Sequence, residues 1–293
     1  MIEILLPEGA RAREAFGPDG SAVLHPEEAA LVATATEGRR EEFTTVRGCA
    51  RRAMTDLGLP PAPVLSGRRN VPQWPVGVVG SMTHCAGYRA AALARDTDLV
   101  AVGIDAEPNR PLPQGVLETI ALPGELAWAR SPVAGAERVC RDRLLFSAKE
   151  AVYKTWFPLV GTELDFQDAR LSVRTDADSL RRGTFRAEVL RPAAGPDGRP
   201  VTGFGGRWLA DRGLVVTAIA VPAPGGAGTR VGRGCPGPGR CVACEDRTDC
   251  ARRTACGHPA VRARRDAAFP APRPARSGSP LEALPNRPER YSR

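Results

Sequence analysis

Two acidic residues close a short apolar run in the first half of the chain. The run Val102-Gly103-Ile104 leads into Asp105 and Glu107, which are separated by one residue. Alternate residues of a strand face the same side, so both carboxylates would share one face. Paired carboxylates suit Mg²⁺, which takes carboxylate, water and substrate phosphate oxygens as ligands. The alternative is an exposed strand end that carries two solvated acids, because such pairs are common.

A second group of candidates lies on a segment with helical spacing. Phe146-Ser147-Ala148-Lys149-Glu150 continues to Lys154, so Glu150 and Lys154 stand one helical turn apart on one face. A carboxylate there could bind a metal or act as a base, and the ammonium could bind phosphate. An ion pair on a helix surface explains the same spacing. Lys149 and Lys154 are the only lysines beside 39 arginines, and a crowded phosphate site could require the compact charge of lysine.

A third candidate is Gly80-Ser81-Met82-Thr83-His84-Cys85, which holds one of three histidines. Small residues let the backbone approach a ligand, and His84 could hydrogen-bond a phosphate. A turn with a buried histidine is the alternative. Cys85 is interpreted as a packed thiol, because no second histidine or acid lies near it in sequence. Several arginines could bind phosphate oxygens or line a solvated helix face: Arg39, Arg40, Arg47, Arg51, Arg52, Arg68 and Arg69.

The surrounding pattern predicts the elements that would position these residues. Residues 1–65 are predicted to be helical, with a helix start at 26–32 and a helix over 41–57. Residues 141–156 are predicted to form a helix that Pro158 stops. The predicted strands are 76–79, 89–94, 99–104, 169–173, 184–190, 206–209 and 214–221. A helix followed by antiparallel strands, occurring twice, predicts an α+β fold with two similar halves, about residues 1–110 and 111–225.

The net charge of +8 is confined to the end of the chain. Residues 226–293 contain 14 arginines and six acidic residues, which accounts for the whole excess. The remaining 225 residues are neutral overall, so composition does not support nucleic-acid binding by this part. We expect residues 1–225 to form the functional domain and 226–293 to be a disordered tail rich in Pro, Gly and Arg.

Five of the eight cysteines lie in this tail, at positions 235, 241, 244, 250 and 256. Cys241 and Cys244 have the spacing of a zinc knuckle, but no second close pair accompanies them. A zinc or iron–sulfur centre and an unstructured extension are the two interpretations.

No run of 18 apolar residues is present, and the first 15 residues lack the basic-then-apolar pattern of a signal peptide. We therefore expect no membrane span and a cytoplasmic location, where disulfides are rare. We also expect a monomer.

Together the three motifs resemble those of one enzyme family. Gly80-Ser81-x-Thr83-His84, Gly103-Ile104-Asp105-x-Glu107 and Phe146-Ser147-Ala148-Lys149-Glu150-x-x-x-Lys154 resemble the signatures of surfactin- and enterobactin-type 4'-phosphopantetheinyl transferases. The resemblance covers about residues 20–222. Trp74-Pro75, Thr83-His84-Cys85 and the upstream Glu42-Phe43…Arg47 resemble the enterobactin-synthase branch, including its actinobacterial members.

This resemblance implies a fold, a ligand and roles for the candidates. Members have two pseudo-symmetric halves, each a small antiparallel sheet with a packed helix, and bind coenzyme A in the cleft between them. Asp105, Glu107 and Glu150 would hold Mg²⁺ on the coenzyme A pyrophosphate, and Lys154 would neutralise its oxygens. Ser81, Thr83, His84, Arg39 and Arg47 would line the coenzyme A site, where His84 and the two arginines hold the adenosine phosphates, chiefly the 3'-phosphate. Family members often carry a lysine in the loop before the second motif, and this chain offers Arg68 or Arg69 there.

The resemblance also implies a reaction. A serine of an apo acyl, aryl or peptidyl carrier domain would attack the β-phosphate of coenzyme A, and 3',5'-adenosine bisphosphate would leave. Glu150 or a metal-bound hydroxide would take the serine proton. The rival interpretations are a coenzyme A-binding regulator without catalysis and a metal-binding interaction protein that works through its tail.

Overall fold

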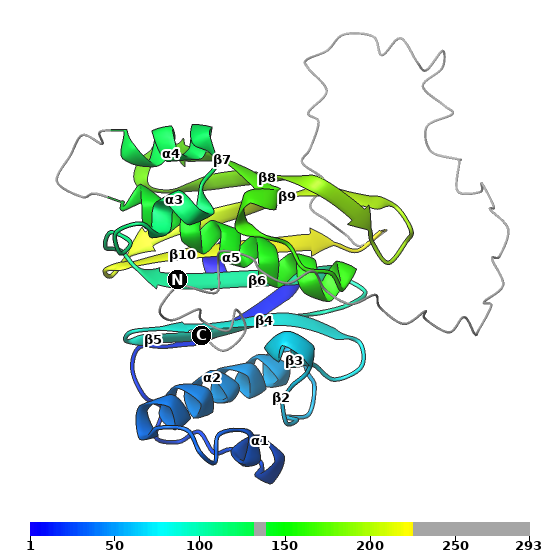
Figure 1. Cartoon of the computed structure of the whole chain (residues 1–293). Helices are drawn as coiled ribbons and strands as arrows, with labels where there is room; N and C mark the ends of the chain where they lie inside the picture. Colours follow the sequence, from blue (N-terminus) through cyan, green and yellow to red (C-terminus); the bar gives the residue numbers. More distant parts are fainter. Residues whose placement is uncertain (132–138, 225–293) are drawn as a thin grey trace, which may run out of the picture. The chain divides into compact units, whose positions relative to one another are not determined.

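The computed structural model describes residues 1–131 and 139–224. The N-terminal half is built on a three-stranded antiparallel sheet. Helix α2 packs on one face of this sheet, where Val46, Ala50 and Met54 meet Met82 and Ala91 (Figure 1). The sheet order is β1 (Ala10–Ala15), β5 (Tyr88–Arg95), β4 (Val78–Cys85). The other elements of this half are α1 (Pro26–Leu31), α2 (Glu37–Asp56) and the short pair β2 (Leu65–Ser66) and β3 (Pro72–Gln73).

The C-terminal half holds a five-stranded antiparallel sheet with a long helix, α5, across one face (Figure 1). Trp156 of α5 and Trp208 of the sheet are almost fully buried in the core between them. The sheet order is β6 (Leu99–Pro108), β10 (Leu214–Pro222), β9 (Pro200–Asp211), β8 (Ser179–Ala194), β7 (Ala169–Asp176). The helices are α3 (Val116–Ile120), α4 (Pro123–Arg130) and α5 (Arg141–Val160).

The two sheets meet through an apolar core and two side-chain hydroxyls. Tyr88 and Ala90 of β5 pack in one cluster with Ile104 of β6 and Val216 of β10. Strands β4 and β6 lie side by side without pairing in one sheet. Instead, the Ile104 amide donates to Ser81 Oγ at 3.1 Å, and the Ala106 amide donates to Thr83 Oγ1 at 3.1 Å. These hydroxyls satisfy backbone groups that burial would otherwise leave without partners.

Gly103 lets α5 approach β6 closely. A Cβ atom at this position would lie 2.1 Å from Thr155 Oγ1 and 2.3 Å from the Ala151 carbonyl oxygen, both on α5. Only glycine leaves space for this contact, so the Gly103-Ile104-Asp105 sequence sets how near the helix comes to the acidic pair.

The predicted fold class is confirmed, because the chain combines helices with antiparallel sheets in two halves. The predicted helix over 141–156 is present and extends to Val160, with Pro158 inside its last turn. Gly161 ends it in the left-handed conformation (φ 77°), and its amide donates to the Phe157 carbonyl at 2.8 Å.

The structure differs from the predicted secondary structure at three places. Residues 10–15 form strand β1 inside the region predicted to be helical, because Ala10 and Ala12 alternate into the core at the period of a strand. Residues 80–85, which lie outside the predicted strands and for which a turn was the alternative, belong to β4, where the polar Ser81 and Thr83 face a neighbouring strand. Helices α3 and α4 lie in a region for which no element was predicted.

The boundary between the two sheets lies earlier in the chain than the predicted boundary near residue 110. Strand β6 pairs with β10 and so belongs to the second sheet. Within the two described ranges, no helix has both the length and the apolar character needed to cross a bilayer. The predicted tail over 226–293, including cysteines 235–256, lies outside the described residues.

Candidate active site

The acidic pair on β6 is buried between this strand and α5. Asp105 and Glu107 are 3% and 2% exposed, so the alternative of two solvated acids at a strand end is wrong. The Lys154 ammonium lies 2.7 Å from Asp105 Oδ1, and the Thr83 hydroxyl donates to the same oxygen at 3.3 Å. Asp105 Oδ2 is buried and has no hydrogen-bond partner among the described residues. One oxygen of Asp105 is thus held by the protein and the other is left for a ligand.

Glu107 is held by a residue for which the sequence analysis predicted no role. Arg143 Nη1 donates to Glu107 Oε2 at 2.9 Å. The same guanidinium donates to the carbonyl oxygens of Arg110 and Pro111, each at 3.0 Å, and so fixes the loop after β6. A signal for Arg143 exists in the sequence, because it lies seven residues before Glu150 and therefore on the same helix face.

Glu150 and Lys154 both point away from solvent, at 4% and 1% exposure. Ser147, on the same stripe of α5, hydrogen-bonds Thr217 of β10 at 3.0 Å, and Thr217 is the direct neighbour of Asp105 across the strands. The stripe therefore faces the acidic pair. The spacing of Glu150 and Lys154 is thus not explained by an ion pair on the helix surface.

A divalent cation fits the acidic pair through the unpartnered oxygen of Asp105, which is a hard ligand in a buried position. No group of three or more His, Cys, Asp or Glu side chains forms a metal cluster within the described part of the chain. Asp105 and Glu107 are thus the side chains in place, and Glu150 would be the third.

The other lysine, Lys149, faces away from this site. Its ammonium lies 2.8 Å from Glu125 Oε2 and donates to the carbonyl oxygens of Phe166 (2.7 Å) and Ala169 (2.9 Å). The Leu171 amide donates to the second oxygen of Glu125 at 2.6 Å. This buried pair connects α4, α5 and β7, so Lys149 has a structural role and Lys154 is the lysine of the site.

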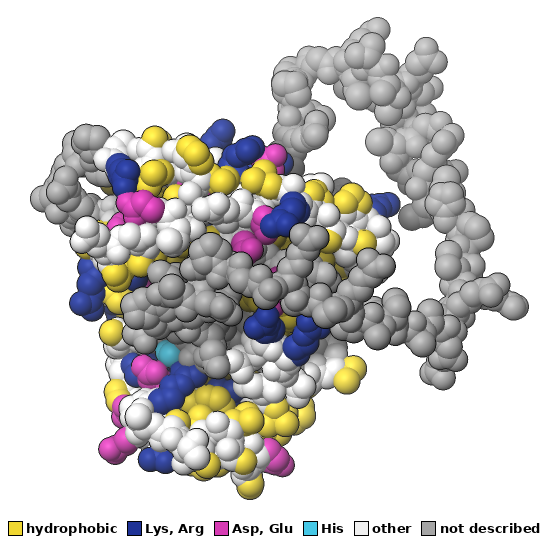
Figure 2. All heavy atoms as spheres, viewed as in Figure 1, with side chains coloured by type: hydrophobic (Ala, Val, Ile, Leu, Met, Phe, Trp, Pro, Cys, Tyr) yellow, Lys and Arg dark blue, Asp and Glu magenta, His cyan; other side chains and the backbone are white. Residues whose placement is uncertain are grey.

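His84 lies in a separate charged cluster with Arg39 and Glu42 of α2. Arg39 Nη1 donates to His84 Nε2 at 2.7 Å, and His84 Nδ1 lies 3.5 Å from Glu42 Oε2. An arginine can only donate, so Nε2 must accept and the imidazole proton belongs on Nδ1, which faces the carboxylate. Figure 2 shows basic side chains gathered beside a histidine over the N-terminal half.

Three of the other predicted arginines make contacts with other parts of the chain. Arg47 is 4% exposed, its guanidinium carbon lies 3.1 Å above the centre of the Phe43 ring, and its Nε donates to the Val64 carbonyl at 3.0 Å. Burial lowers the pKa of Arg47 to about 9. Arg68 lies 6.0 Å from the Phe157 ring centre. Arg69 Nε lies 2.6 Å from Glu163. Both thus contact the end of α5 or the segment after it.

The side chains of Ser81 and Thr83 are fully buried and join the two sheets, a role that the sequence analysis did not predict. Cys85 is buried in part, and burial together with the Glu107 and Asp105 carboxylates raises its pKa to about 12. The thiol stays protonated at neutral pH, which agrees with its interpretation as a packed thiol rather than a nucleophile.

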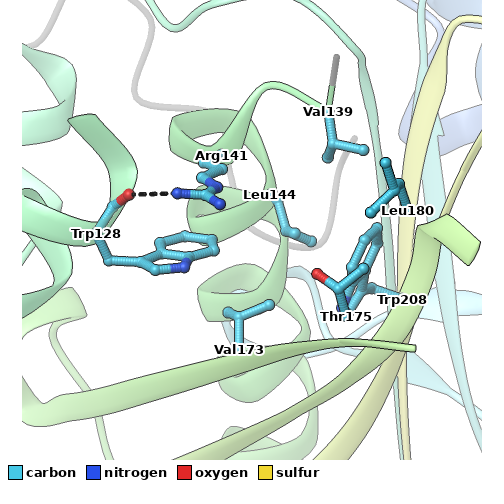
Figure 3. Close-up of a pocket in the computed structure, with 8 residues that line it drawn as sticks. All are labelled: Trp128, Val139, Arg141, Leu144, Val173, Thr175, Leu180 and Trp208. Atoms are coloured by element: carbon cyan, nitrogen blue, oxygen red, sulfur yellow. Dashed lines mark hydrogen bonds between the residues drawn. The ribbon is translucent and has the colours of Figure 1, made fainter. Parts of the chain in front are cut away.

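A pocket of about 70 Å³ lies at the other end of α5 (Figure 3). Trp128, Leu180 and Trp208 lie around it, and Arg141 donates to the Trp128 carbonyl at 3.3 Å. None of the predicted site residues lines this pocket. The guanidinium of Arg141 is hydrogen-bonded to Trp128 and Ser131 at the end of α4. The pocket is therefore mainly apolar and differs in chemistry from the acidic pair.

Comparison with known proteins connects this geometry to one family. The model of the 4'-phosphopantetheinyl transferase N-terminal domain matches residues 27–94, and the model of the 4'-phosphopantetheinyl transferase superfamily matches residues 101–194. The chain is 53% identical over 251 residues to the 4'-phosphopantetheinyl transferase Svp of Streptomyces mobaraensis, which covers 85% of this chain and 99% of Svp.

Two further relatives carry the same description. The 4'-phosphopantetheinyl transferase Npt of Nocardia iowensis is 44% identical over 75% of this chain and 99% of its own length. The 4'-phosphopantetheinyl transferase PptT of Mycobacterium tuberculosis is 48% identical over 67% of this chain and 85% of its own length. The two matched regions meet at the β5–β6 connection, which is the point where the chain passes from the first sheet to the second.

Proposed function

The chain belongs to the 4'-phosphopantetheinyl transferase superfamily, whose members move the phosphopantetheine group of coenzyme A onto a serine of a carrier protein, and we propose that it performs this transfer between β6 and α5. The observation that supports this location is the buried Lys154–Asp105 pair beside an Asp105 oxygen without a partner. The buried ammonium of Lys154 suits a pyrophosphate, and the Asp105 oxygen without a partner suits the metal that the pyrophosphate carries.

The roles of the residues follow from their charge and placement. Lys154 donates to the pyrophosphate oxygens and stabilises the charge that grows on them as the bond breaks. Glu150 takes the proton from the carrier serine, because it lies one turn before Lys154 on the stripe that faces Asp105. The serine oxygen forms a bond to the β-phosphorus, the bond to the adenosine phosphate breaks, and 3',5'-adenosine bisphosphate leaves.

The family uses a divalent metal, and we propose Mg²⁺ for this chain. Asp105 would hold it through Oδ2, with Glu107 and Glu150 as further ligands. When bound, Mg²⁺ neutralises the pyrophosphate charge. Arg143 fixes the carboxylate of Glu107 from the side of the loop, so that Glu107 keeps one orientation.

We also propose a branch of the family and a class of carrier proteins for this chain. Trp74-Pro75 and Thr83-His84-Cys85 support an enterobactin-synthase-like branch, which serves carriers of polyketide, nonribosomal peptide or siderophore synthesis. We also propose that Ser81 and Thr83 shape the coenzyme A site by holding β4 against β6, and that Arg68 or Arg69 replaces the usual loop lysine. Cytoplasmic location and a monomeric state remain predictions.

The transfer can be tested directly with the full chain. Purified protein is incubated with coenzyme A, Mg²⁺ and apo carrier domains of the acyl, aryl and peptidyl types, and each carrier is weighed by mass spectrometry. We expect the mass of one phosphopantetheine to be added. A carrier with serine replaced by alanine is the control and should gain nothing. Binding of coenzyme A without any gain in carrier mass would favour the rival, a coenzyme A-binding regulator.

A further inference from the structure

Arg89 is a buried cation whose charge is poorly satisfied within the protein. It lies on β5 directly opposite His84 of β4, so the two side chains share the face that α2 covers. Arg89 is 6% exposed, and its ion pair with Glu42 Oε1 spans 3.7 Å. Its Nε has no hydrogen-bond partner among the described residues. Burying a guanidinium whose Nε donor is unused costs free energy unless a ligand accepts from it.

The neighbours of Arg89 form a site for an anion. Glu42 lies between Arg89, Arg39 and His84, at 3.7, 3.7 and 3.5 Å, which are long contacts for ion pairs. Two guanidinium groups thus share one carboxylate. The side chain of Glu42 is 28% exposed, so it can turn toward solvent when a stronger anion arrives.

The cluster and the acidic pair lie on opposite faces of β4. Thr83 and His84 are consecutive residues of β4, so their side chains point to opposite faces. Thr83 contacts Asp105 of the acidic pair, and His84 contacts Arg39 of the cluster. The end of β4 therefore separates a site for a pyrophosphate from a site for a second anion.

We propose that Arg89 is a specificity-determining residue that binds the 3'-phosphate of coenzyme A together with Arg39 and His84, and that Glu42 holds these groups when no donor is bound. This inference rests on the proposed function, because it assumes that coenzyme A is the donor. A phosphate can accept a charge-assisted hydrogen bond from the unused Nε of Arg89, and it can approach Nη2 more closely than the carboxylate of Glu42 does at 3.7 Å.

The test compares two donors that differ only in this group. Calorimetry with coenzyme A and with dephospho-coenzyme A, both in Mg²⁺, gives their affinities for the wild-type chain and its variants. Arg89→Gln should weaken coenzyme A binding about 10–100-fold, the range expected for lost bonds to a charged group. Binding of dephospho-coenzyme A should change less than about twofold. Arg89→Lys should recover part of the preference, because the charge remains.

Two further variants sharpen the comparison. Glu42→Gln removes the competing carboxylate and should increase the preference for coenzyme A. Arg95→Gln is the matched control, since Arg95 lies at the exposed end of the same strand and donates to the Leu57 carbonyl, and it should alter neither affinity. Thermal melting of each variant shows whether it is folded.

The outcomes separate the two proposals. A loss confined to coenzyme A supports the assignment of Arg89. An equal loss for both donors, or no loss for either, in folded Arg89→Gln and Arg89→Lys would overturn it, even if the wild-type chain transfers phosphopantetheine to carriers. Failure of transfer by the wild-type chain would instead contradict the proposed function.

Discussion

Asp105 shows how a single residue can serve both the fold and the site. Its Oδ1 accepts from Lys154 and Thr83, which joins α5, β6 and β4, while Oδ2 remains without a partner among the described residues. An exposed acid at the end of a strand would contribute little to stability. Burial changes that expectation, because a buried ion pair that loses one partner leaves a charge uncompensated.

Asp105→Ala should therefore abolish transfer and also lower the free energy of unfolding, by about 3 kcal/mol. Urea denaturation measures the second effect. The control is Glu188→Ala, which removes an exposed pair with Arg170 of similar length, 2.9 Å, and should cost less than about 1 kcal/mol. Equal costs for both variants would show that the Asp105 pair is not desolvated.

Glu150 and Lys154 should respond differently to substitution. Glu150→Gln should reduce turnover by at least about 10²–10⁴-fold, the usual effect of losing a general base, and weaken coenzyme A binding far less. Lys154→Ala should lower both affinity and rate. Lys154→Arg should also be poorly tolerated, because the 1% exposed ammonium fits closely against Asp105. Calorimetry and carrier turnover measure both quantities.

Arg174→Lys, on the exposed face of β7, is the matching control for the exchange of one cation for the other. Full turnover in Glu150→Gln, or wild-type behaviour in Lys154→Arg, would contradict the roles proposed for this pair.

At the scale of elements, the site depends on how closely α5 lies on β6. Gly103 determines this distance, and the acidic pair follows it on the same strand. Arg143 and Lys154, three turns apart on α5, then reach Glu107 and Asp105 respectively. Helix α5 therefore carries Arg143, Glu150 and Lys154, whereas β6 carries Asp105 and Glu107. A change in the spacing of the two elements would disturb both charge pairs together.

Gly103→Ala should displace α5, because the new Cβ would meet the Ala151 carbonyl oxygen at 2.3 Å. We expect a loss of about 1–3 kcal/mol in stability, the cost typical of overpacking, and a large loss of turnover. Gly205→Ala is the control, since a Cβ there meets nothing within 4 Å. Unchanged turnover in Gly103→Ala would mean that the helix can shift without disturbing the site.

The segment between β1 and α1 is tied to α2 by an ion pair between Asp19 and Arg52. Hydrogen bonds from Ser21, followed by the bond from Arg52, lower the pKa of Asp19 to about 2. A carboxylate with a lowered pKa contributes stability that is present above its unfolded pKa and lost as the pH falls through the folded pKa.

Asp19→Asn should thus be less stable than the wild type at pH 7 and lose less of its stability between about pH 4 and pH 2. Urea denaturation at pH 7, 4 and 2.5 measures this. Glu8→Gln, which changes an exposed carboxylate, should follow the wild-type curve. Parallel curves for Asp19→Asn and the wild type would show that the ion pair does not stabilise the native state.

At the scale of the whole molecule, charge and fold separate along the chain. The excess of +8 belongs to residues 226–293, whereas the two sheets, the acidic pair and the anion cluster all lie before Pro224. The last described contact of the second sheet is the bond from the Ala223 amide to the Asp98 carbonyl, at 3.0 Å. Every residue proposed to act in catalysis therefore precedes the basic tail.

Truncation after Pro224 should leave a folded and active transferase, with turnover within about twofold of the full chain. The last strand predicted from the sequence ends at residue 221, but the bond made by the Ala223 amide favours the later position. Size-exclusion chromatography and carrier turnover check the result. Aggregation of the truncated chain, or loss of transfer, would show that the tail contributes to the fold or to carrier binding.

The sequence by itself determined much of the local structure of the candidate site. The spacing of Asp105 and Glu107 places them on one strand face, and the spacing of Glu150 and Lys154 places them on one helix face. These predictions succeed because the periods of strand and helix depend on local backbone geometry. The same locality explains the errors at residues 10–15 and 80–85, where contacts with distant strands decided the structure.

Only the tertiary structure decided which charges meet. Arg143 reaches Glu107 across 36 residues, because α5 crosses β6 at the place that Gly103 leaves open. Arg89 comes beside His84 through the register of the β4–β5 hairpin, and both reach Glu42 because α2 packs on that face. Local periodicity contains no information on such pairings, since they depend on the packing of whole elements.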